Sequence, residues 1–181
     1  MGTVAVDHSR SRAGPRARRP PRGDVRRRPV VASDLLRTQE TAEHVAVALG
    51  LTPTFDSAWR ERDFGFLQGL TDAEVCEQFP EYALDVVGHA AAGERPRGGE
   101  SFLDCRDRVL TVWQALVDGL DTDETVVVVA HGGPIRFVLA DLKGLDVVET
   151  ILGQEQDNCA LTEGRVTSPP ELVRENETEF L

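Results

Sequence analysis

The stretch TVVVVAHGGPIR, residues 125–136, constrains the fold of this chain more than any other part of the sequence. A continuous run of mostly β-branched residues over Thr125–Ala130 predicts a central strand that is buried on both faces. A histidine and two glycines follow at His131–Gly133, and Pro134 stands where a helix can begin. The sequence therefore predicts a buried strand that passes directly into a helix, with a histidine at the junction.

The junction at His131 has the features of an anion site. Ligands of open α/β sheets bind at the carboxyl ends of the strands. The first turn of a helix offers unpaired N–H groups and a positive dipole end. Gly132 and Gly133 let the backbone approach a ligand because they carry no Cβ. The alternative is a glycine turn with an incidental histidine, and this stretch by itself supports the two interpretations equally.

Short strands alternate with helices along the chain. Residues 29–32 predict a strand, Ser33 an N-cap, and Gly50 the end of the helix that follows. A second helix begins at Ser101, where Asp104 completes a capping box. This alternation predicts the α/β class, as a three-layer α/β/α sandwich with a largely parallel central sheet.

The remaining elements are predicted less sharply. Residues 59–79 predict a loop followed by a short helix, and residues 86–100 predict an excursion marked by glycine and proline. The helix after the central strand ends near Gly144, which suits a position just beyond a helix. A last strand is predicted at 158–166, with a polar tail beyond Pro170.

Charge is distributed unevenly along the sequence. Residues 1–28 carry nine Arg against two Asp, a net charge of +7, whereas residues 29–181 carry a net charge of −18, which together give −11. Lys143 is the only lysine. The acidic body argues against nucleic-acid binding, although the Arg-rich segment permits it by charge alone. The composition favours a high-salt cytoplasm, and an acidic mesophilic protein is the alternative.

The N-terminal segment differs in composition from everything after it. In residues 10–29, thirteen of twenty residues are Arg or Pro, without apolar periodicity. The sequence predicts a basic, disordered segment at 1–29, in which Thr3–Val6 looks like a strand, and a domain at 30–181. Natural divergence and a change of reading frame both explain such a segment, and the coding DNA would distinguish them.

Cysteine usage and hydropathy limit the class of protein. Cys76, Cys105 and Cys159 are far apart and include no C-x-x-C pair, which argues against a disulfide framework or a thiolate zinc site. No apolar run approaches the roughly 18 residues that a membrane span needs. We therefore expect a cytoplasmic protein with no membrane partner.

Two further side chains could complete an anion site. Arg37 projects from the first turn of the helix after strand 29–32, and its planar guanidinium suits phosphate oxygens. Glu61 lies in the predicted loop and could donate a proton. Taken singly, each is more simply explained as a solvated side chain.

Four segments together resemble the histidine phosphatase superfamily, which includes the cofactor-dependent phosphoglycerate mutases. They are SDLLRTQETA, WRERDFGFLQGL, GGES and AHGGPIR, and they follow the family's order between Val31 and the C-terminus. The resemblance implies that Arg37 contacts phosphate, Glu61 is the proton donor and His131 is the second active-site histidine. Gly132 is expected beside the phosphate.

The resemblance also implies the chemistry, which is phosphoryl transfer on a small phosphorylated metabolite without a metal or other cofactor. A histidine attacks phosphorus and becomes a phosphohistidine, which water then hydrolyses. A phosphatase is the expected enzyme. A phosphoglycerate mutase-type isomerase and an inactive phosphate-binding pseudo-phosphatase are the alternatives.

The nucleophile is expected at His8, which follows the strand predicted at Thr3–Val6. The family has Arg-His-Gly at this point, whereas this chain has Asp7-His8-Ser9. The charge of Asp7 opposes the binding of a phosphate dianion. Only 24 residues separate His8 from Ser33, so the family's first helix is missing. Turnover by this chain therefore depends on a degraded nucleophile motif.

Overall fold

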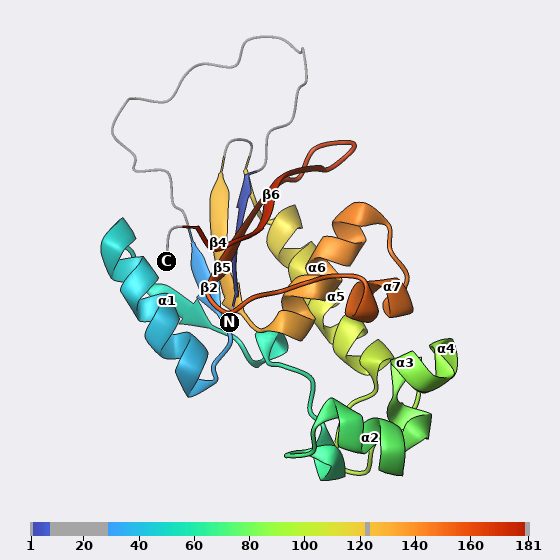
Figure 1. The fold of residues 1–181 in the computed structure, drawn as a ribbon. Coiled ribbons are helices and arrows are strands. Elements are labelled where there is room, and N and C mark those ends of the chain that lie inside the picture. The colour runs from blue at the N-terminus through green and yellow to red at the C-terminus, as the bar shows by residue number, and fades with distance from the viewer. Residues whose placement is uncertain (1, 8–28, 122–123, 180–181) are drawn as a thin grey trace, which may run out of the picture.

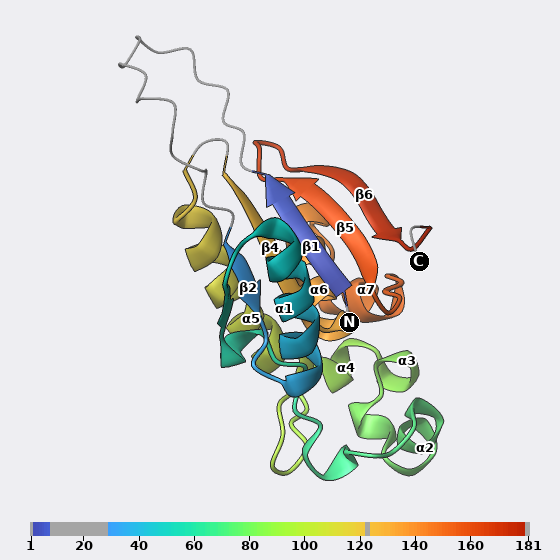
Figure 2. The same cartoon turned by 90° about the vertical axis from the view of Figure 1, so that its left-hand side faces the viewer.

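The fold is built on one six-stranded sheet. The computed structural model describes residues 2–7, 29–121 and 124–179. Across the sheet the strands lie in the order β3-β2-β4-β1-β5-β6. Figure 1 shows the sheet nearly edge-on, and Figure 2 shows β2 to β6 side by side. Their bounds are Gly2–Asp7 (β1), Val30–Ala32 (β2), Pro53–Phe55 (β3), Thr125–Ala130 (β4), Ala160–Arg165 (β5) and Glu171–Glu177 (β6). The strand predicted to be central, β4, is confirmed as an interior strand with a neighbour on each side.

Helices cover both faces of this sheet. The α-helices of the described residues are Leu36–Leu49 (α1), Asp72–Gln78 (α2), Leu84–Val87 (α3), His89–Ala92 (α4), Phe102–Asp118 (α5), Gly132–Lys143 (α6) and Val147–Leu152 (α7). Helix α1 lies on one face, and α5 and α6 lie on the other (Figures 1 and 2). The predicted α/β class with three layers is confirmed. Among the described residues, no helix is long and apolar enough to cross a membrane.

Strand β4 carries the core on both of its faces. Val126 and Val128 belong to the larger apolar cluster, which includes α5, α6 and α7. Val127 and Val129 face the other way and pack with Ala42 of α1. A strand covered on both faces has no polar side to expose, which explains why its sequence is continuously apolar instead of alternating.

The strands do not all run in the same direction. β3, β2 and β4 are parallel, so the predicted parallel sheet is confirmed for these three strands. β1 is antiparallel to β4, with Gly2 opposite Ala130 and Asp7 opposite Thr125, and it is parallel to β5. The carboxyl ends of β2, β3 and β4 therefore share one edge of the sheet, and β1 ends at the opposite edge.

Two predicted positions at helix starts were wrong. Helix α1 begins at Leu36, with Leu35 at the N-cap and no side-chain cap. Ser33 lies before that helix, where its Oγ accepts a hydrogen bond from the Leu35 N–H at 3.3 Å and closes a turn. Pro134 is the third residue of α6, because His131 is the N-cap of this helix.

Other predicted helix starts and ends are confirmed. Gly50 and Gly144 end α1 and α6 in the left-handed conformation, with φ of 68° and 71°. Ser101 and Asp104 form the predicted capping box at the start of α5. The predicted polar tail, in contrast, is wrong, because β6 pairs antiparallel with β5. Backbone hydrogen bonds form this strand, and its side chains show no pattern that would predict it.

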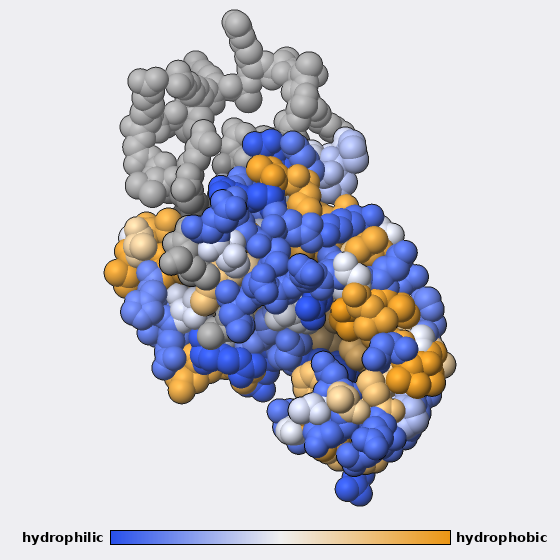
Figure 3. Space-filling model, in the orientation of Figure 1, coloured by the Kyte–Doolittle hydropathy of each residue, from blue (hydrophilic) through white to orange (hydrophobic). Residues whose placement is uncertain are grey.

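A lobe of short helices lies beside the carboxyl edge of the parallel strands (Figure 2). Besides α2, α3 and α4, it contains 3₁₀ turns, at Gly65–Leu67 (η2) and Pro80–Tyr82 (η3), and the turn Ser57–Trp59 (η1) leads into it. The space-filling view shows the lobe set off from the body, with apolar side chains on the surface over α3, α4 and α7 (Figure 3).

The predicted domain boundary falls next to a segment that the structure does not describe. Residues 8–28 lie outside the described residues, and the description resumes at Pro29, just before β2. Ahead of that segment, residues 2–7 form β1, as the strand-like sequence at Thr3–Val6 predicts. Division into a basic segment and a domain stays a prediction.

Candidate active site

The site is built at the shared carboxyl edge of the three parallel strands. β2 leads to Ser33 and on to Arg37 in the first turn of α1, and β4 leads directly to His131. β3 leads through η1 to the loop that carries Glu61. Residues distant in sequence meet at this edge because the strands that precede them are neighbours in the sheet.

His131 is held by hydrogen bonds at both ring nitrogens. Its Nδ1 lies 3.1 Å from Nη2 of Arg37, and its Nε2 lies 2.9 Å from Oγ of Ser33. A guanidinium can only donate, so Nδ1 is the acceptor and the ring proton resides on Nε2, which donates to Ser33. The side chain is buried, with 4% of its surface exposed. These contacts fix the tautomer and the orientation of the ring.

The same surroundings keep His131 uncharged. Burial removes water from the ring and, together with the positive charge of Arg37, lowers the pKa of His131 from 6.5 to about 4. At neutral pH the imidazole is therefore neutral. A bound dianion would reverse part of this effect, because a nearby negative charge favours the imidazolium.

Arg37 presents its guanidinium to solvent at the mouth of the site. The side chain is exposed, and its hydrogen bond within the described residues goes to His131. The remaining N–H groups of the planar fork are thus available to oxygens of a ligand. Arg60, in contrast, is paired through two hydrogen bonds of 2.6 Å with Asp34, which ties the loop after β2 to the loop of Glu61.

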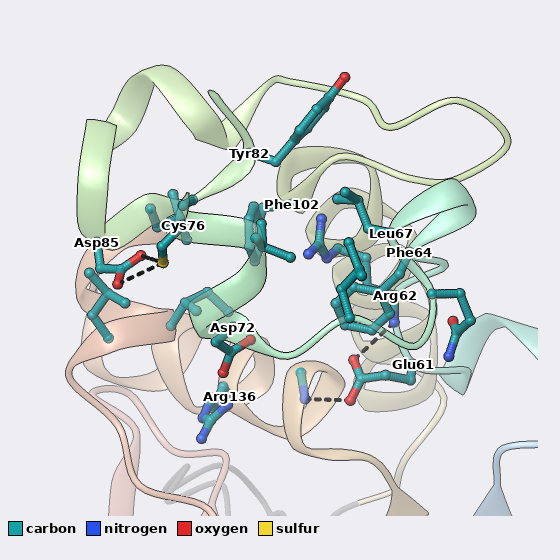
Figure 4. Close-up of a pocket in the computed structure, with 18 of the residues that line it drawn as sticks. Glu61, Arg62, Phe64, Leu67, Asp72, Cys76, Tyr82, Asp85, Phe102 and Arg136 are labelled. Carbon is teal, nitrogen blue, oxygen red and sulfur yellow. Dashed lines mark hydrogen bonds between the residues drawn. The ribbon is translucent and has the colours of Figure 1, made fainter. Parts of the chain in front are cut away.

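Glu61 is fixed by two backbone N–H groups. Its Oε1 accepts from Arg62 at 2.9 Å, and its Oε2 accepts from Gly133 at 3.1 Å (Figure 4). A Cβ added to Gly133 would lie 2.2 Å from Oε1 of Glu61, so only glycine at this position leaves the carboxylate where it is. Since Gly133 donates to Glu61 and Pro134 has no N–H, Gly132 supplies the remaining backbone donor at the start of α6.

A close crossing of two loops sets the position of Glu61. A Cβ on Gly99 would come within 2.5 Å of the Asp63 carbonyl oxygen and 2.6 Å of the Gly65 nitrogen. The Glu100 N–H donates to the Asp63 carbonyl at 2.8 Å. This explains the GGES sequence: Gly99 permits the approach, and Ser101 then caps α5.

Glu100 and, from α5, Arg108 hold the Glu61 loop in place through hydrogen bonds. Arg108 donates from Nε and Nη2 to the two carboxylate oxygens of Glu100, at 2.8 and 2.7 Å. Its Nη1 donates to the carbonyl oxygens of Ala58 and Arg60, at 2.9 and 3.0 Å. The two bonds from Nη1 hold the loop on both sides of Trp59, and Nη2 also donates to the Glu61 carbonyl at 3.5 Å.

A cavity of about 530 Å³ opens beside Glu61 and Gly133 (Figure 4). It lies between α6 and the lobe, and its walls include Phe102, Phe137 and Ile151. This volume is in the range of small-molecule sites. No group of three or more potential metal ligands occurs among the described residues.

The structure brings together four of the five site residues predicted from the sequence. Arg37 contacts His131, and Glu61 binds the backbone two residues after His131. Gly132 lies at the same helix start. His8, the predicted nucleophile, lies outside the described residues, and the strand that precedes it ends at the edge opposite to His131.

Sequence reasoning missed Ser33 and Arg108 as parts of the site, and it expected Gly133 beside a ligand instead of beside Glu61. Ser33 was interpreted as a helix cap, yet it is fully buried and bonded to His131. Gly133 and Gly132 are adjacent glycines after His131. The sequence alone does not show which of them contacts a phosphate and which contacts Glu61. Arg108 sits two helical turns beyond Glu100, but nothing in an exposed-looking helical arginine signals a loop anchor.

Comparisons with known proteins show which proteins the chain resembles in sequence. The family model of the histidine phosphatase superfamily, branch 1, matches residues 12–176. A 2,3-bisphosphoglycerate-dependent phosphoglycerate mutase of Bartonella quintana is 34% identical over 127 residues, 68% of this chain and 61% of that protein. A glucosyl-3-phosphoglycerate phosphatase of Mycolicibacterium vanbaalenii is 36% identical over 124 residues, 65% of this chain and 54% of that protein. The chain thus spans little more than half the length of these curated relatives.

Solved structures resemble the chain over a larger part of its length. A mycobacterial glucosyl-3-phosphoglycerate phosphatase in complex with inorganic phosphate superposes with a TM-score of 0.66 and 30% identity, covering 83% of this chain and 77% of the other. YhfR of Bacillus stearothermophilus shares the fold, with a TM-score of 0.72 and 19% identity over 99% of this chain and 98% of the other.

Proposed function

Because the chain belongs to the histidine phosphatase superfamily, we propose that its site performs phosphatase-type phosphoryl transfer on a small phosphate ester. The observation that carries the proposal is the contact between Arg37 and His131 at the carboxyl edge of the parallel strands, with Glu61 bound at the same helix start. Positioning and charge stabilisation are what phosphoryl transfer requires of a protein. These three side chains supply both without a metal.

Binding of the phosphate group is the first step. The free N–H groups of Arg37 and the N–H of Gly132 would hold the equatorial oxygens, at the positive end of the α6 dipole. His131 would donate its Nε2 proton to a phosphate oxygen in place of Ser33, since the bond between them is made by the same ring nitrogen. The buried neutral ring can accept this change at little electrostatic cost.

Proton transfer is assigned to Glu61. When the ester P–O bond breaks, the departing alkoxide would take a proton from the Glu61 carboxyl group. In the second half of the reaction Glu61 would accept a proton from the water that attacks phosphorus. The two backbone N–H groups that hold Glu61 would keep its carboxyl group beside the leaving oxygen in the first step and beside the attacking water in the second.

The nucleophile is assigned to His8. Its ring nitrogen would form the P–N bond as the ester bond breaks, and water would then release inorganic phosphate and restore the histidine. A second function, phosphate-ester binding without turnover, is favoured by the direction of β1, which places Asp7 opposite Thr125 and not beside His131. A mutase is the enzymatic rival, supported by the name of the Bartonella quintana relative.

Two measurements test the proposal. Inorganic phosphate should bind the full chain, and Arg37→Ala should weaken this binding by about 30-fold, because one charge-assisted contact contributes about 2 kcal/mol. The matched control is Arg97→Ala, an exposed arginine outside the Arg37–His131–Glu61 site, which should bind phosphate like the parent. Equal phosphate affinity in both variants would refute the binding site.

Turnover is tested with p-nitrophenyl phosphate in concentrated KCl. Hydrolysis that is lost in both His131→Ala and His8→Ala, with an acid-labile phosphohistidine that the His8→Ala variant lacks, supports the complete phosphatase. Hydrolysis that survives His8→Ala would refute the assigned nucleophile. Phosphate binding without hydrolysis would establish the second function, and phosphate returned on another oxygen of phosphoglycerate would establish the mutase.

A further inference from the structure

The cavity beside Glu61 continues directly from the phosphate end of the site. Glu61 and Gly133 both line it, and Glu61 is the group assigned to protonate the leaving oxygen. An ester whose phosphorus lies at Arg37 and His131 must therefore direct its leaving group into this cavity. What the walls can contact decides which alcohol is accepted.

Apolar side chains form one part of the cavity walls. Leu67 and Leu84 come from the lobe, Phe102 from the start of α5, Phe137 from α6, and Ile151 from α7. Leu67, Leu84 and Phe137 are at most 4% exposed, so they are parts of the packed interior that also face the cavity. Such a surface favours a leaving group with an apolar body, because its burial removes apolar area from water.

The charged groups of the cavity disfavour a second anion. Asp72 and Asp85 add two carboxylates to that of Glu61, and the thiol of Cys76 donates to Asp85 at 3.3 Å. In Figure 4 the carboxylate of Asp72 points toward Arg136. An acidic leaving group in the cavity would meet these carboxylates at short range.

The two arginines of the cavity are engaged already. The Arg62 guanidinium lies 3.8 Å from the ring centroid of Phe102 and 4.5 Å from that of Phe64, and its Nη1 donates to the Glu100 carbonyl. Arg136 donates from Nε to the Gln154 carbonyl at 2.9 Å and faces Asp72 (Figure 4). A carboxylate of the substrate would therefore compete with the rings and the carbonyl for Arg62, and with Asp72 for Arg136.

We propose that this chain selects phosphate monoesters whose leaving group is uncharged and largely apolar, such as an aryl or branched alkyl alcohol, and discriminates against phosphorylated acids of the phosphoglycerate type. The inference rests on the proposed function, since it assumes that phosphorus is held at Arg37 and His131. It would separate this chain from the two relatives described above, whose names refer to phosphoglycerates.

Equilibrium binding of phosphonates, which are not hydrolysed, tests the inference on the full chain. The probes are inorganic phosphate, benzylphosphonate, butylphosphonate, 2-carboxyethylphosphonate and 2-aminoethylphosphonate. They are titrated calorimetrically in one buffer at about 0.1 M salt, because higher salt would screen the exposed carboxylates Asp72 and Asp85. Benzylphosphonate should bind at least about 10-fold more tightly than phosphate, because its ring buries apolar surface. The carboxyethyl compound should bind at least about 10-fold more weakly than the butyl compound, because it meets the carboxylates of the cavity.

Paired variants of α2 identify the source of the discrimination. Asp72→Asn should strengthen binding of 2-carboxyethylphosphonate about 3- to 5-fold and leave butylphosphonate unchanged, because it removes one charge that faces the cavity. Glu77→Gln removes an exposed charge from the same helix, outside the cavity lining, and should change neither affinity. Circular dichroism melting confirms that both variants fold.

The outcomes separate the two proposals. Phosphate that fails to bind would overturn the proposed function and this inference with it. Phosphate that binds while the carboxyethyl compound equals or exceeds the benzyl compound would overturn the inference alone. Tightest binding of the aminoethyl compound would also overturn it, since the cavity would then be selecting a cation.

Discussion

The two halves of the sheet differ in what they deliver to the candidate site. In the parallel half, β2, β3 and β4 end at one edge, and the chain beyond them supplies Arg37, Glu61 and His131. In the other half, β1 and β5 begin at that edge and run away from it. β6 ends at the site edge but lies farthest from β4, so strand direction and position in the sheet together decide which strands can supply this site.

The halves also differ in burial. Val126–Ala130 of β4 are at most 8% exposed, whereas β6 at the far edge is exposed or half-exposed along its whole length. Side chains buried on both faces hold β4 rigidly, and a rigid strand end positions His131 well. The parallel half thus provides stability and geometry to the site together.

The strongest loss of stability is expected where the loop before α5 crosses the loop that follows β3. Gly99→Ala should lower the free energy of unfolding by about 3 kcal/mol, because its Cβ would overlap backbone atoms of Asp63 and Gly65, which cannot rotate away. In Gly93→Ala the nearest atom would be 3.9 Å away, at Leu103, so the change should stay within about 1 kcal/mol and be stabilising. Urea denaturation measures both, and equal midpoints would show that the crossing does not constrain the Glu61 loop.

The contrast in burial predicts the next effect. Val128→Ala in β4 should lower the free energy of unfolding by about 2.5 kcal/mol, the transfer cost of two methyl groups plus the cavity that remains. Val173→Ala in β6, where the valine is 42% exposed, should cost under about 0.5 kcal/mol. The same denaturation experiment decides, and a cost for Val173→Ala that matches that of Val128→Ala would remove the distinction between the halves.

Much of the parallel half could be predicted from the sequence. The apolar run of β4 has no polar alternation, so its burial on both faces follows from composition alone, and Gly50 and Gly144 mark the helix ends by their freedom to adopt positive φ. The family resemblance then selected Arg37, Glu61 and His131. These signals are local, which is why a sequence reveals them.

The rest depends on contacts between distant segments. The direction of β1 is set by its pairing with β4 and β5. The sequence of Gly2–Asp7 is compatible with a strand that runs parallel or antiparallel to β4, so it does not predict this direction. Ser33 was mistaken for a cap because a serine after a strand suits both roles, and only the proximity of His131 decides between them. Arg108 reaches the Glu61 loop across 47 residues of sequence.

A pH effect of about 2 kcal/mol is expected from His131. The folded pKa, about 4, lies below the ordinary 6.5, so the unfolded chain takes up the proton first. The contribution of neutral His131 is therefore complete above pH 6.5 and is lost as the pH falls towards 4, which amounts to about 2 kcal/mol by pH 5. The free energy of unfolding falls between pH 7 and pH 5, and we expect this fall to be about 2 kcal/mol smaller in His131→Gln than in the parent.

The control for the pH experiment is His44→Gln, which replaces an exposed histidine of α1. It should keep the parental pH dependence, including the part that arises from carboxylates common to all three proteins. A His131→Gln variant with the same slope as the parent would contradict a depressed pKa, because the folded and unfolded chains would then take up the proton of His131 at the same pH.

The smallest effect concerns Ser33, at the end of β2. Ser33→Ala removes the acceptor of the buried Nε2–H of His131, which should cost about 1 to 2 kcal/mol, because a buried donor is left unsatisfied. Ser57→Ala, at an exposed serine in η1, should cost almost nothing. If the two variants unfold alike, the Ser33–His131 bond contributes no stability and the tautomer assigned to His131 loses its support. If only Ser33→Ala is destabilised, the ends of β2 and β4 are coupled through this bond, as a site made by neighbouring parallel strands requires.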